Sequence, residues 1–289
     1  MDTQRIAHLI DLEKLPLDRL DSDDYAQVVA AAQAELDVDG CTVIKGFLRS
    51  EALPQLSKEI TTIRPQLHES LIDINPYFSE GDPLLPHDHP VNTFIERSGG
   101  FIPRDAFNPT SDFEAVYQNP AFLSFLSDCL NVPEVHCFAD PLAGLTINVL
   151  DSGQQFAWHF DTNDFAVTCL IDESKEGGLF EYSPGIRSDG TENFAGIAEV
   201  LADRPAGRAS VKTLELHPGD LQIFRGRNSV HRVTRVGVES TTRNTAVFAY
   251  TEEAGVIGRL ERTYQLFGRV LPAHQEAERQ RVRSDCLKD

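Results

Sequence analysis

Residues 156–172 read FAWHFDTNDFAVTCLID and combine apolar runs with two metal-binding side-chain types. In an extended strand, side chains two positions apart point to the same face, so His159 and Asp161 are predicted to face one common space. An HxD pair alone is a weak signal, because such pairs arise often by chance and commonly lie at a strand edge. Its interpretation depends on the segments around it.

Short apolar or alternating runs separated by turn residues continue on both sides of this stretch. Eight such runs predict a sandwich or barrel, at 134–140, 144–153, 165–172, 178–184, 210–220, 221–228, 229–237 and 244–253. One insertion, 186–208, interrupts the series, and its ENFAGIAEVLAD segment is typical of a helix. The predicted fold class is mainly β with flanking helices.

The flanks of this strand-rich region carry helical patterns. They cover 22–36, 50–67 and 113–130 before it and the tail after residue 256, and a strand is expected around Val43. Between residues 68 and 110 no regular period fits, which predicts a lid or binding loop, or else a plain surface loop. We expect a single domain over 1–289, with a helical part at about 1–130, a β core at about 131–252 and C-terminal helices at about 256–289.

Charge and composition narrow the class of partner. The 289 residues include 26 Lys and Arg against 45 Asp and Glu, a net charge of −19 that disfavours nucleic acid. No stretch has the length of a membrane span or the pattern of a secretory signal, and the five scattered cysteines form no CxxC pair. We therefore expect a cytoplasmic protein with no membrane partner and a small-molecule substrate.

A third candidate metal ligand lies on a later predicted strand, in SVHRVTRV, which contains His231. Two imidazoles and one carboxylate, with the opposite coordination positions open, form the ligand set of non-haem Fe(II) oxygenases. Arg243 and Thr245 follow in TTRNTAVFAY. A guanidinium fork matches a carboxylate in bidentate fashion, so Arg243 could hold an oxo-diacid such as 2-oxoglutarate. The alternative is an exposed arginine in a surface ladder.

The blocks WHFDTNDF, GGLFEYSPGIRS, GDLQIFRGRNSVHRVTRV and RNTAVFAY resemble the Fe(II)/2-oxoglutarate-dependent oxygenases of double-stranded β-helix fold, a jelly-roll and cupin-like core. The resemblance runs from about residue 40 to 250 and is closest to the carrier-independent amino-acid radical halogenases and their hydroxylase relatives. It implies that His159, Asp161 and His231 are the catalytic metal ligands. It also implies that Arg243, helped by Thr245, anchors 2-oxoglutarate.

Two details of this resemblance shape the expected chemistry. The gap from His231 to Arg243 is slightly longer than is common in the family, which makes Arg225 the rival anchor. Halogenating members carry a small residue at the position of Asp161, so oxygen transfer is expected here instead of halogenation.

The resemblance implies that Fe(II), 2-oxoglutarate and O2 are used to hydroxylate an unactivated C–H of a free amino acid or an amino-acid-derived metabolite, with release of succinate and CO2. One alternative is desaturation or cyclisation after the same hydrogen abstraction. Others are a carrier-bound substrate and a non-catalytic cupin-like protein that binds a metal or small molecule.

Candidate contacts are scattered over several segments. Phe156 stands where lysine-using members carry a polar histidine, which favours a less polar or differently shaped amino acid. The other candidate substrate residues are Trp158, Asn163, Asp164, Arg97 and Arg104, and Asn148 is a candidate for the cosubstrate, with packing or solvation as the alternative for each. The tail segment RLERTYQLFGRV is interpreted as a solvated helix face, with a homodimer contact as the alternative.

Overall fold

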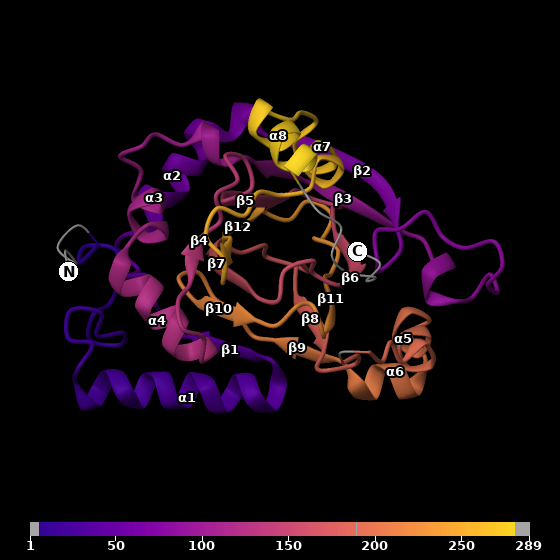
Figure 1. Cartoon of the computed structure of the whole chain (residues 1–289), viewed down its shortest axis with the longest axis horizontal. Helices are drawn as coiled ribbons and strands as arrows, with labels where there is room; N and C mark the ends of the chain where they lie inside the picture. The colour runs from indigo at the N-terminus through magenta and orange to yellow at the C-terminus, as the bar shows by residue number, and fades with distance from the viewer. Residues whose placement is uncertain (1–5, 189, 281–289) are drawn as a thin grey trace.

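The computed structural model describes residues 6–188 and 190–280, so Cys286 lies outside the described residues. Two antiparallel sheets enclose a common interior (Figure 1). The larger sheet has the order β1-β10-β7-β12-β5-β3-β2. Its strands are β1 Cys41–Ile44, β2 His68–Ile74, β3 Ile95–Ile102, β5 Leu145–Leu150, β7 Ala166–Asp172, β10 Leu221–Phe224 and β12 Arg243–Phe248.

The smaller sheet has the order β6-β11-β8-β9 and carries the metal-binding candidates. Its strands are β6 Phe156–His159, β8 Phe180–Ser183, β9 Lys212–Leu214 and β11 Val230–Val233. A two-stranded ribbon of β4 His136–Cys137 and β13 Tyr250–Thr251 completes the β structure of the described residues. The predicted mainly β jelly-roll class is confirmed.

Helices surround the sheets on three sides (Figure 1). The N-terminal helices α1 to α4 lie on one side, the inserted pair α5 and α6 lies on another, and α7 and α8 lie over the end of the barrel. Their bounds are α1 Asp23–Asp39, α2 Leu53–Ile63, α3 Asp112–Tyr117, α4 Pro120–Leu130, α5 Phe194–Leu201, α6 Pro205–Ser210, α7 Leu260–Phe267 and α8 Pro272–Gln280, with 3-10 turns η1 Arg64–Gln66, η2 Pro90–Asn92 and η3 Arg104–Ala106.

Alternation along β12 separates the core from the interior of the barrel. Ala246 and Phe248 pack into the large apolar core that also contains residues of α1, α2 and α4. Arg243 and Thr245, on the opposite face of the same strand, therefore point between the two sheets. A second apolar cluster fills part of this interior with side chains from both sheets, including Phe156.

The expectation that 68–110 lacks regular structure was wrong. Strands β2 and β3 pair antiparallel over their whole lengths and extend the larger sheet. Glycines in β3 concealed the strand, because they are needed for close packing. A Cβ on Gly99 would lie 2.6 Å from the Phe156 ring, and one on Gly100 would lie 2.5 Å from Leu67.

The predicted helical insertion and C-terminal helices are confirmed by α5 and by α7 and α8. In the part of the chain that the structure describes, no helix is long and apolar enough to cross a membrane. The four described cysteines are free thiols.

Candidate active site

Three metal-binding side chains converge where the smaller sheet opens. His159 ends β6, His231 lies on β11, and the register of these antiparallel strands places the two residues directly opposite each other. Asp161 follows β6, and its Oδ1 lies 3.9 Å from His159 Nε2 and 3.5 Å from His231 Nε2. One ligand atom from each residue lies within 4.8 Å of the others, which fits three ligands on one face of a metal ion.

Backbone carbonyls orient both imidazoles for metal binding. The Nδ1 of His159 lies 2.8 Å from the carbonyl oxygen of Ala157, and the Nδ1 of His231 lies 3.0 Å from that of Ser229. Each Nδ1–H therefore donates to a carbonyl, which leaves the Nε2 lone pair for a metal. Burial, and secondly the His231 imidazole, hold the pKa of His159 well below its usual value.

Asp161 is fitted closely against the backbone of the β10–β11 turn. Its N–H donates to the carbonyl of Gly226 at 3.2 Å. A Cβ added at Gly226 would lie 1.9 Å from Asp161 Oδ2, so this turn has room for the carboxylate only because residue 226 is glycine. Burial raises the pKa of Asp161, but the two histidines lower it more, and the net pKa lies below its usual value.

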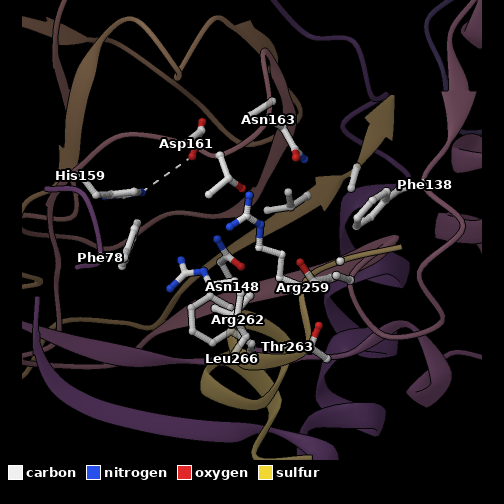
Figure 2. A pocket seen from close by; sticks show the side chains of 18 of the residues that line it. Phe78, Phe138, Asn148, His159, Asp161, Asn163, Arg259, Arg262, Thr263 and Leu266 are labelled. Atoms are coloured by element: carbon white, nitrogen blue, oxygen red, sulfur yellow. Dashed lines mark ion pairs between the residues drawn. The ribbon is translucent and has the colours of Figure 1, made fainter. Parts of the chain in front are cut away.

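A cavity of about 470 Å³ opens in front of the three ligands. This volume lies within the usual range for small-molecule sites. Figure 2 shows His159 and Asp161 on one side of the cavity and Arg259, Arg262 and Leu266 of the α7 region on the other. Four of the candidate contact residues, Phe156, Asn163, Arg97 and Asn148, line this cavity, and aromatic side chains make up much of the remaining wall.

Arg243 lies at the start of β12 and lines a separate cavity of about 290 Å³ beside Gly178 and Phe180, not the cavity in front of the three ligands. It is buried, and its Nη1 donates to the Thr245 hydroxyl. Thr245 in turn is paired across the strands with Asn148, which lines the cavity in front of the three ligands. Burial lowers the pKa of Arg243 to about 10, and no described carboxylate lies within ion-pair distance of it. A buried guanidinium without a protein counter-charge favours an anionic ligand.

The family model of halogenase D matches residues 89–265, more than half of the chain. The chain belongs to the halogenase D family. No curated protein matches this family member. The family match confirms the predicted resemblance to the radical halogenases and their relatives, and His159, Asp161 and His231 form a group that could hold a metal ion.

Solved structures share the fold of this halogenase D family member at low sequence identity. An oxidoreductase of the 2OG-Fe(II) oxygenase family from Burkholderia pseudomallei is 13% identical, with a TM-score of 0.50 over 79% of this chain and 92% of that chain. AviO1 from Streptomyces viridochromogenes is 16% identical, with a TM-score of 0.52 over 78% and 96%. HygX from Streptomyces hygroscopicus, with nickel and 2-oxoglutarate bound, is 14% identical, with a TM-score of 0.52 over 78% and 88%.

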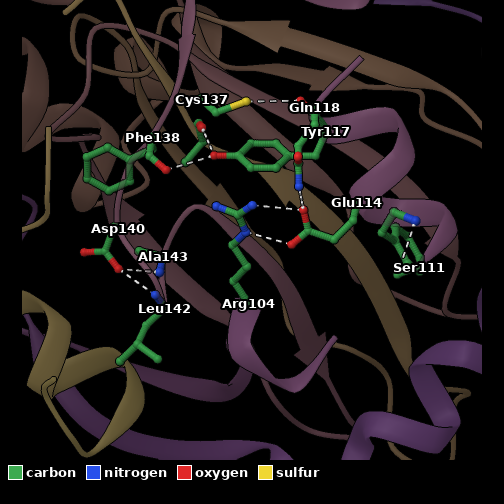
Figure 3. Close-up of polar contacts among 12 residues, drawn as sticks. Arg104, Ser111, Glu114, Tyr117, Gln118, Cys137, Phe138, Asp140, Leu142 and Ala143 are labelled. Carbon is green, nitrogen blue, oxygen red and sulfur yellow. Dashed lines mark hydrogen bonds and ion pairs between the residues drawn. The ribbon is translucent and has the colours of Figure 1, made fainter. Parts of the chain in front are cut away.

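Two of the predicted substrate residues are structural in this family member. Trp158 packs outside the barrel against α5 residues, with the Arg232 guanidinium 4.6 Å from its ring centroid. Arg104 donates to both carboxylate oxygens of Glu114, at 2.7 and 2.9 Å, and lies over the Tyr117 ring (Figure 3). Neither residue lines the cavity. Trp158 points to the outer face of its strand, and Arg104 is paired with Glu114.

Two further candidate contact residues, Asp164 and Arg225, lie near strand ends and away from the cavity. Asp164 has a side chain that is 73% exposed, lies 3.6 Å from Arg227 and does not line the cavity. Arg225, the rival anchor, has a partly exposed side chain 4.0 Å from Asp37 and also does not line the cavity. Arg243 does not line this cavity either, but Arg243 is buried, whereas the side chain of Arg225 is 41% exposed beside α1. Arg243 therefore remains the candidate anchor.

The sequence interpretation missed the contribution of α7 and of the loop after β2. Arg262, Leu266 and Phe267 of α7 line the cavity, although this segment was interpreted as a solvated face. Their spacing of four and five residues on a short helix was the available signal. Phe78 also lines the cavity, and its ring meets the His159 ring at a centroid distance of 5.6 Å. Its positive φ of 55° gave no sequence signal.

Proposed function

We propose that this oxygenase hydroxylates an unactivated C–H of a free amino acid or an amino-acid-derived metabolite, with release of succinate and CO2. The supporting observation is Arg97, which lines the cavity, is 4% exposed and has no described carboxylate within ion-pair distance. Its guanidinium lies 4.7 Å from the Phe101 ring centroid and 5.1 Å from that of Phe156. A buried cation held beside this stacked pair of aromatic rings, in the cavity of the metal-ligand candidates, is suited to hold a substrate carboxylate.

The proposed roles of the other residues follow from the donor set. His159, Asp161 and His231 would hold iron, and Arg243, with Thr245 and Asn148 nearby, would hold the distal carboxylate of 2-oxoglutarate. Bound Fe(II) supplies O2 activation coupled to decarboxylation of 2-oxoglutarate. The chain contributes orientation of the C–H bond and exclusion of water.

Asp161 supports oxygen transfer in preference to halogenation. In the halogenases that this sequence resembles, a small residue at this position leaves a coordination position for halide. Here the carboxylate lies close to both histidine Nε2 atoms and has its space made by Gly226.

Aromatic side chains of the cavity wall would exclude water from the space beside the metal ligands. Phe78 covers the His159 ring, and Phe101 stacks on Phe156 with the ring planes 6° apart. Phe267 of α7 meets Phe101 edge to face, which connects α7 to the floor of the cavity. These contacts leave a substrate little freedom beside the metal ligands, and the pose would decide which C–H is attacked.

The test is aerobic incubation of Fe(II)-loaded protein with 2-oxoglutarate and a pool of free amino acids, followed by measurement of succinate and of product masses. We expect succinate that depends on one amino acid, and a product heavier by one oxygen atom. Loss of two hydrogens would instead assign desaturation or cyclisation.

The control variants are Asp161→Ala and His231→Ala, which we expect to abolish this succinate signal. Formation of substrate-dependent succinate by both variants would contradict the proposed metal site. Cytoplasmic location, the single domain over 1–289 and the homodimer contact remain predictions.

A further inference from the structure

We propose that the substrate carries a second acidic group, so that it is an amino diacid whose two carboxylates are held by Arg97 and Arg262. This inference rests on the proposed function and deepens it by naming the chemical class of the substrate. The charged side chains that line the cavity support the proposal.

The cavity is cationic within a strongly acidic chain. Its lining includes four arginines but a single carboxylate among the described residues, and that carboxylate is the metal ligand Asp161. The whole chain has a net charge of −19, so this local surplus of positive charge is opposite to the overall balance. The lining arginines would repel a basic substrate side chain such as that of lysine, and no free carboxylate is available to pair with it. The same arginines would attract an acidic substrate side chain.

Two of the four arginines are already engaged by the protein. Arg227 donates to the carbonyl of Thr162 at 3.2 Å and lies 3.6 Å from Asp164. Arg259 has a further interaction within the chain. Neither Arg97 nor Arg262 has a carboxylate within ion-pair distance of its guanidinium in the described part of the chain.

Arg262 extends from α7 toward the metal ligands. Its guanidinium lies 3.8 Å from the Phe78 ring centroid, and it donates to the side-chain oxygen of Gln265. Burial lowers the pKa of Arg262 to about 10, while the Asp161 carboxylate raises it. A metal ion bound to Asp161 would take up that negative charge, which leaves Arg262 in need of another anion.

Arg97 and Arg262 approach the cavity from separate elements, a β-strand and the helix that covers the opening. Burial holds the pKa of Arg97 well below its usual value, and the Arg262 charge lowers it further, so the two cations repel each other. Arg97 lies beside the stacked pair of Phe101 and Phe156, whereas the guanidinium of Arg262 lies over the Phe78 ring. Two anionic groups, one at each guanidinium, would relieve this repulsion.

The cosubstrate does not supply these two anions. In the proposed arrangement one end of 2-oxoglutarate binds the metal, and its distal carboxylate binds Arg243, which lies at the start of β12. The anions at Arg97 and Arg262 would therefore belong to the substrate.

The test is calorimetric titration of protein loaded with Ni(II), which binds without turnover, and with saturating 2-oxoglutarate. The probes are two isosteric pairs, L-aspartate with L-asparagine and L-glutamate with L-glutamine. We expect at least one diacid to bind about tenfold or more tightly than its amide.

Three variants separate the two arginines. Arg262→Gln is expected to reduce the preference for the diacid over its amide to about one, because it removes the partner of the second carboxylate. Arg97→Gln is expected to weaken both members of a pair by similar factors. Arg269→Gln is the matched control, because Arg269 lies just beyond α7, pairs with Asp105 and does not line the cavity, and it should keep the preference.

Amides that bind as tightly as the diacids, an unchanged preference in Arg262→Gln, or no binding by either diacid would each overturn the inference. If a neutral amino acid is hydroxylated under the aerobic assay in any of these cases, the proposed function stands without the diacid. Failure of the protein to bind Ni(II) and 2-oxoglutarate would overturn both.

Discussion

Gly226 is a residue whose missing side chain makes room for a metal ligand. A Cβ there would overlap Asp161 Oδ2 at 1.9 Å, so Gly226→Ala must displace the carboxylate or the turn. We expect Gly226→Ala to weaken metal binding by about tenfold or more, because ligand position is lost. Titration with Ni(II) measures this effect.

Gly185→Ala is the control for this substitution. Gly185 has φ +54° and no atom within 4 Å of an added Cβ, so alanine there should cost roughly 1 kcal/mol of stability through backbone strain. Metal affinity should be unchanged in Gly185→Ala. Equal metal affinity in Gly226→Ala and the parent protein would contradict the proposed position of Asp161.

Arg243 is expected to bind 2-oxoglutarate through its fork of N–H donors. Arg243→Lys keeps the charge but loses the bidentate geometry, and we expect the Kd for 2-oxoglutarate to rise by about tenfold or more. Arg225→Gln is the control, since the side chain of Arg225 is 41% exposed beside Asp37, whereas Arg243 is buried. A larger effect in Arg225→Gln than in Arg243→Lys would reverse the assignment of the anchor.

The sequence predicted that His159, Asp161 and His231 come together, because residue type and strand spacing both indicate it. His159 and Asp161 lie two positions apart, and His231 lies on a strand that pairs with the first. The roles of Trp158 and Arg104 depend instead on the partner that the fold places beside each side chain, Arg232 for Trp158 and Glu114 for Arg104. Residue type alone does not distinguish an arginine that binds a ligand from one that binds a glutamate.

At the scale of elements, the loop after β2 is organised by one buried side chain. Asn75 donates to the carbonyls of Ser79, at 2.9 Å, and Val91, at 2.6 Å, and its Oδ1 accepts from the N–H groups of Tyr77 and Ser79 at 3.1 Å. Asn75→Ala should therefore release the loop that carries Phe78. We expect faster amide hydrogen exchange over residues 76–91 and a loss of roughly 1–3 kcal/mol of stability.

Gln33→Ala, which removes an exposed side-chain amide, is the control for Asn75→Ala. Gln33→Ala removes an exposed hydrogen bond of α1 and should leave exchange over 76–91 unchanged. Unaltered exchange over that loop in Asn75→Ala would show that other contacts hold Phe78 in place.

Helix α7 is held over the cavity through Asp140. Asp140 Oδ2 accepts from the N–H of Gly258 at 3.0 Å and lies 3.0 Å from Nε2 of the fully buried His274 in α8, and its Oδ1 accepts from the N–H of Leu142 at 2.8 Å. Asp140→Ala removes these bonds together. We expect faster hydrogen exchange over 258–267 and weaker binding of the amino acid substrate.

Binding of the metal should change little in Asp140→Ala, because the three ligands come from other segments. Asp105→Ala is the control, because it removes the exposed ion pair with Arg269 without touching Asp140. Substrate binding that survives in Asp140→Ala alongside fast exchange over α7 would show that α7 does not position the substrate.

Strands were predicted correctly where apolar and polar residues alternate plainly. They were missed where close packing requires glycines in the strand. The run that became β12 alternates between core and interior positions, and it was recognised. Strand β3 contains Gly99 and Gly100 because neighbouring side chains leave no space there, so its composition resembled that of a loop. The spacing of Arg262 and Leu266 places both on one face of α7, but the direction of that face depends on where β3 and the loop after β2 lie.

At the scale of the whole molecule, the proposed ligands connect the two sheets. The metal would be held by His159 and His231 of the smaller sheet, and 2-oxoglutarate would extend from it to Arg243 of the larger sheet. A ligand that binds the folded state alone stabilises it by about 2.7 kcal/mol at a concentration 100 times its Kd. We therefore expect Ni(II) to raise the Tm, and 2-oxoglutarate to raise it further when the metal is present.

Variants at the two ends of the proposed ligands show which residues are needed for each rise in Tm. Arg243→Lys should respond to Ni(II) and show a smaller further rise with 2-oxoglutarate, whereas Asp161→Ala and His231→Ala should lose the response to both, since the metal end of the connection is missing. Thermal unfolding with and without a chelator measures each shift. A full Ni(II) response in Asp161→Ala would move the metal to another site, and the two sheets would then be joined by packing alone.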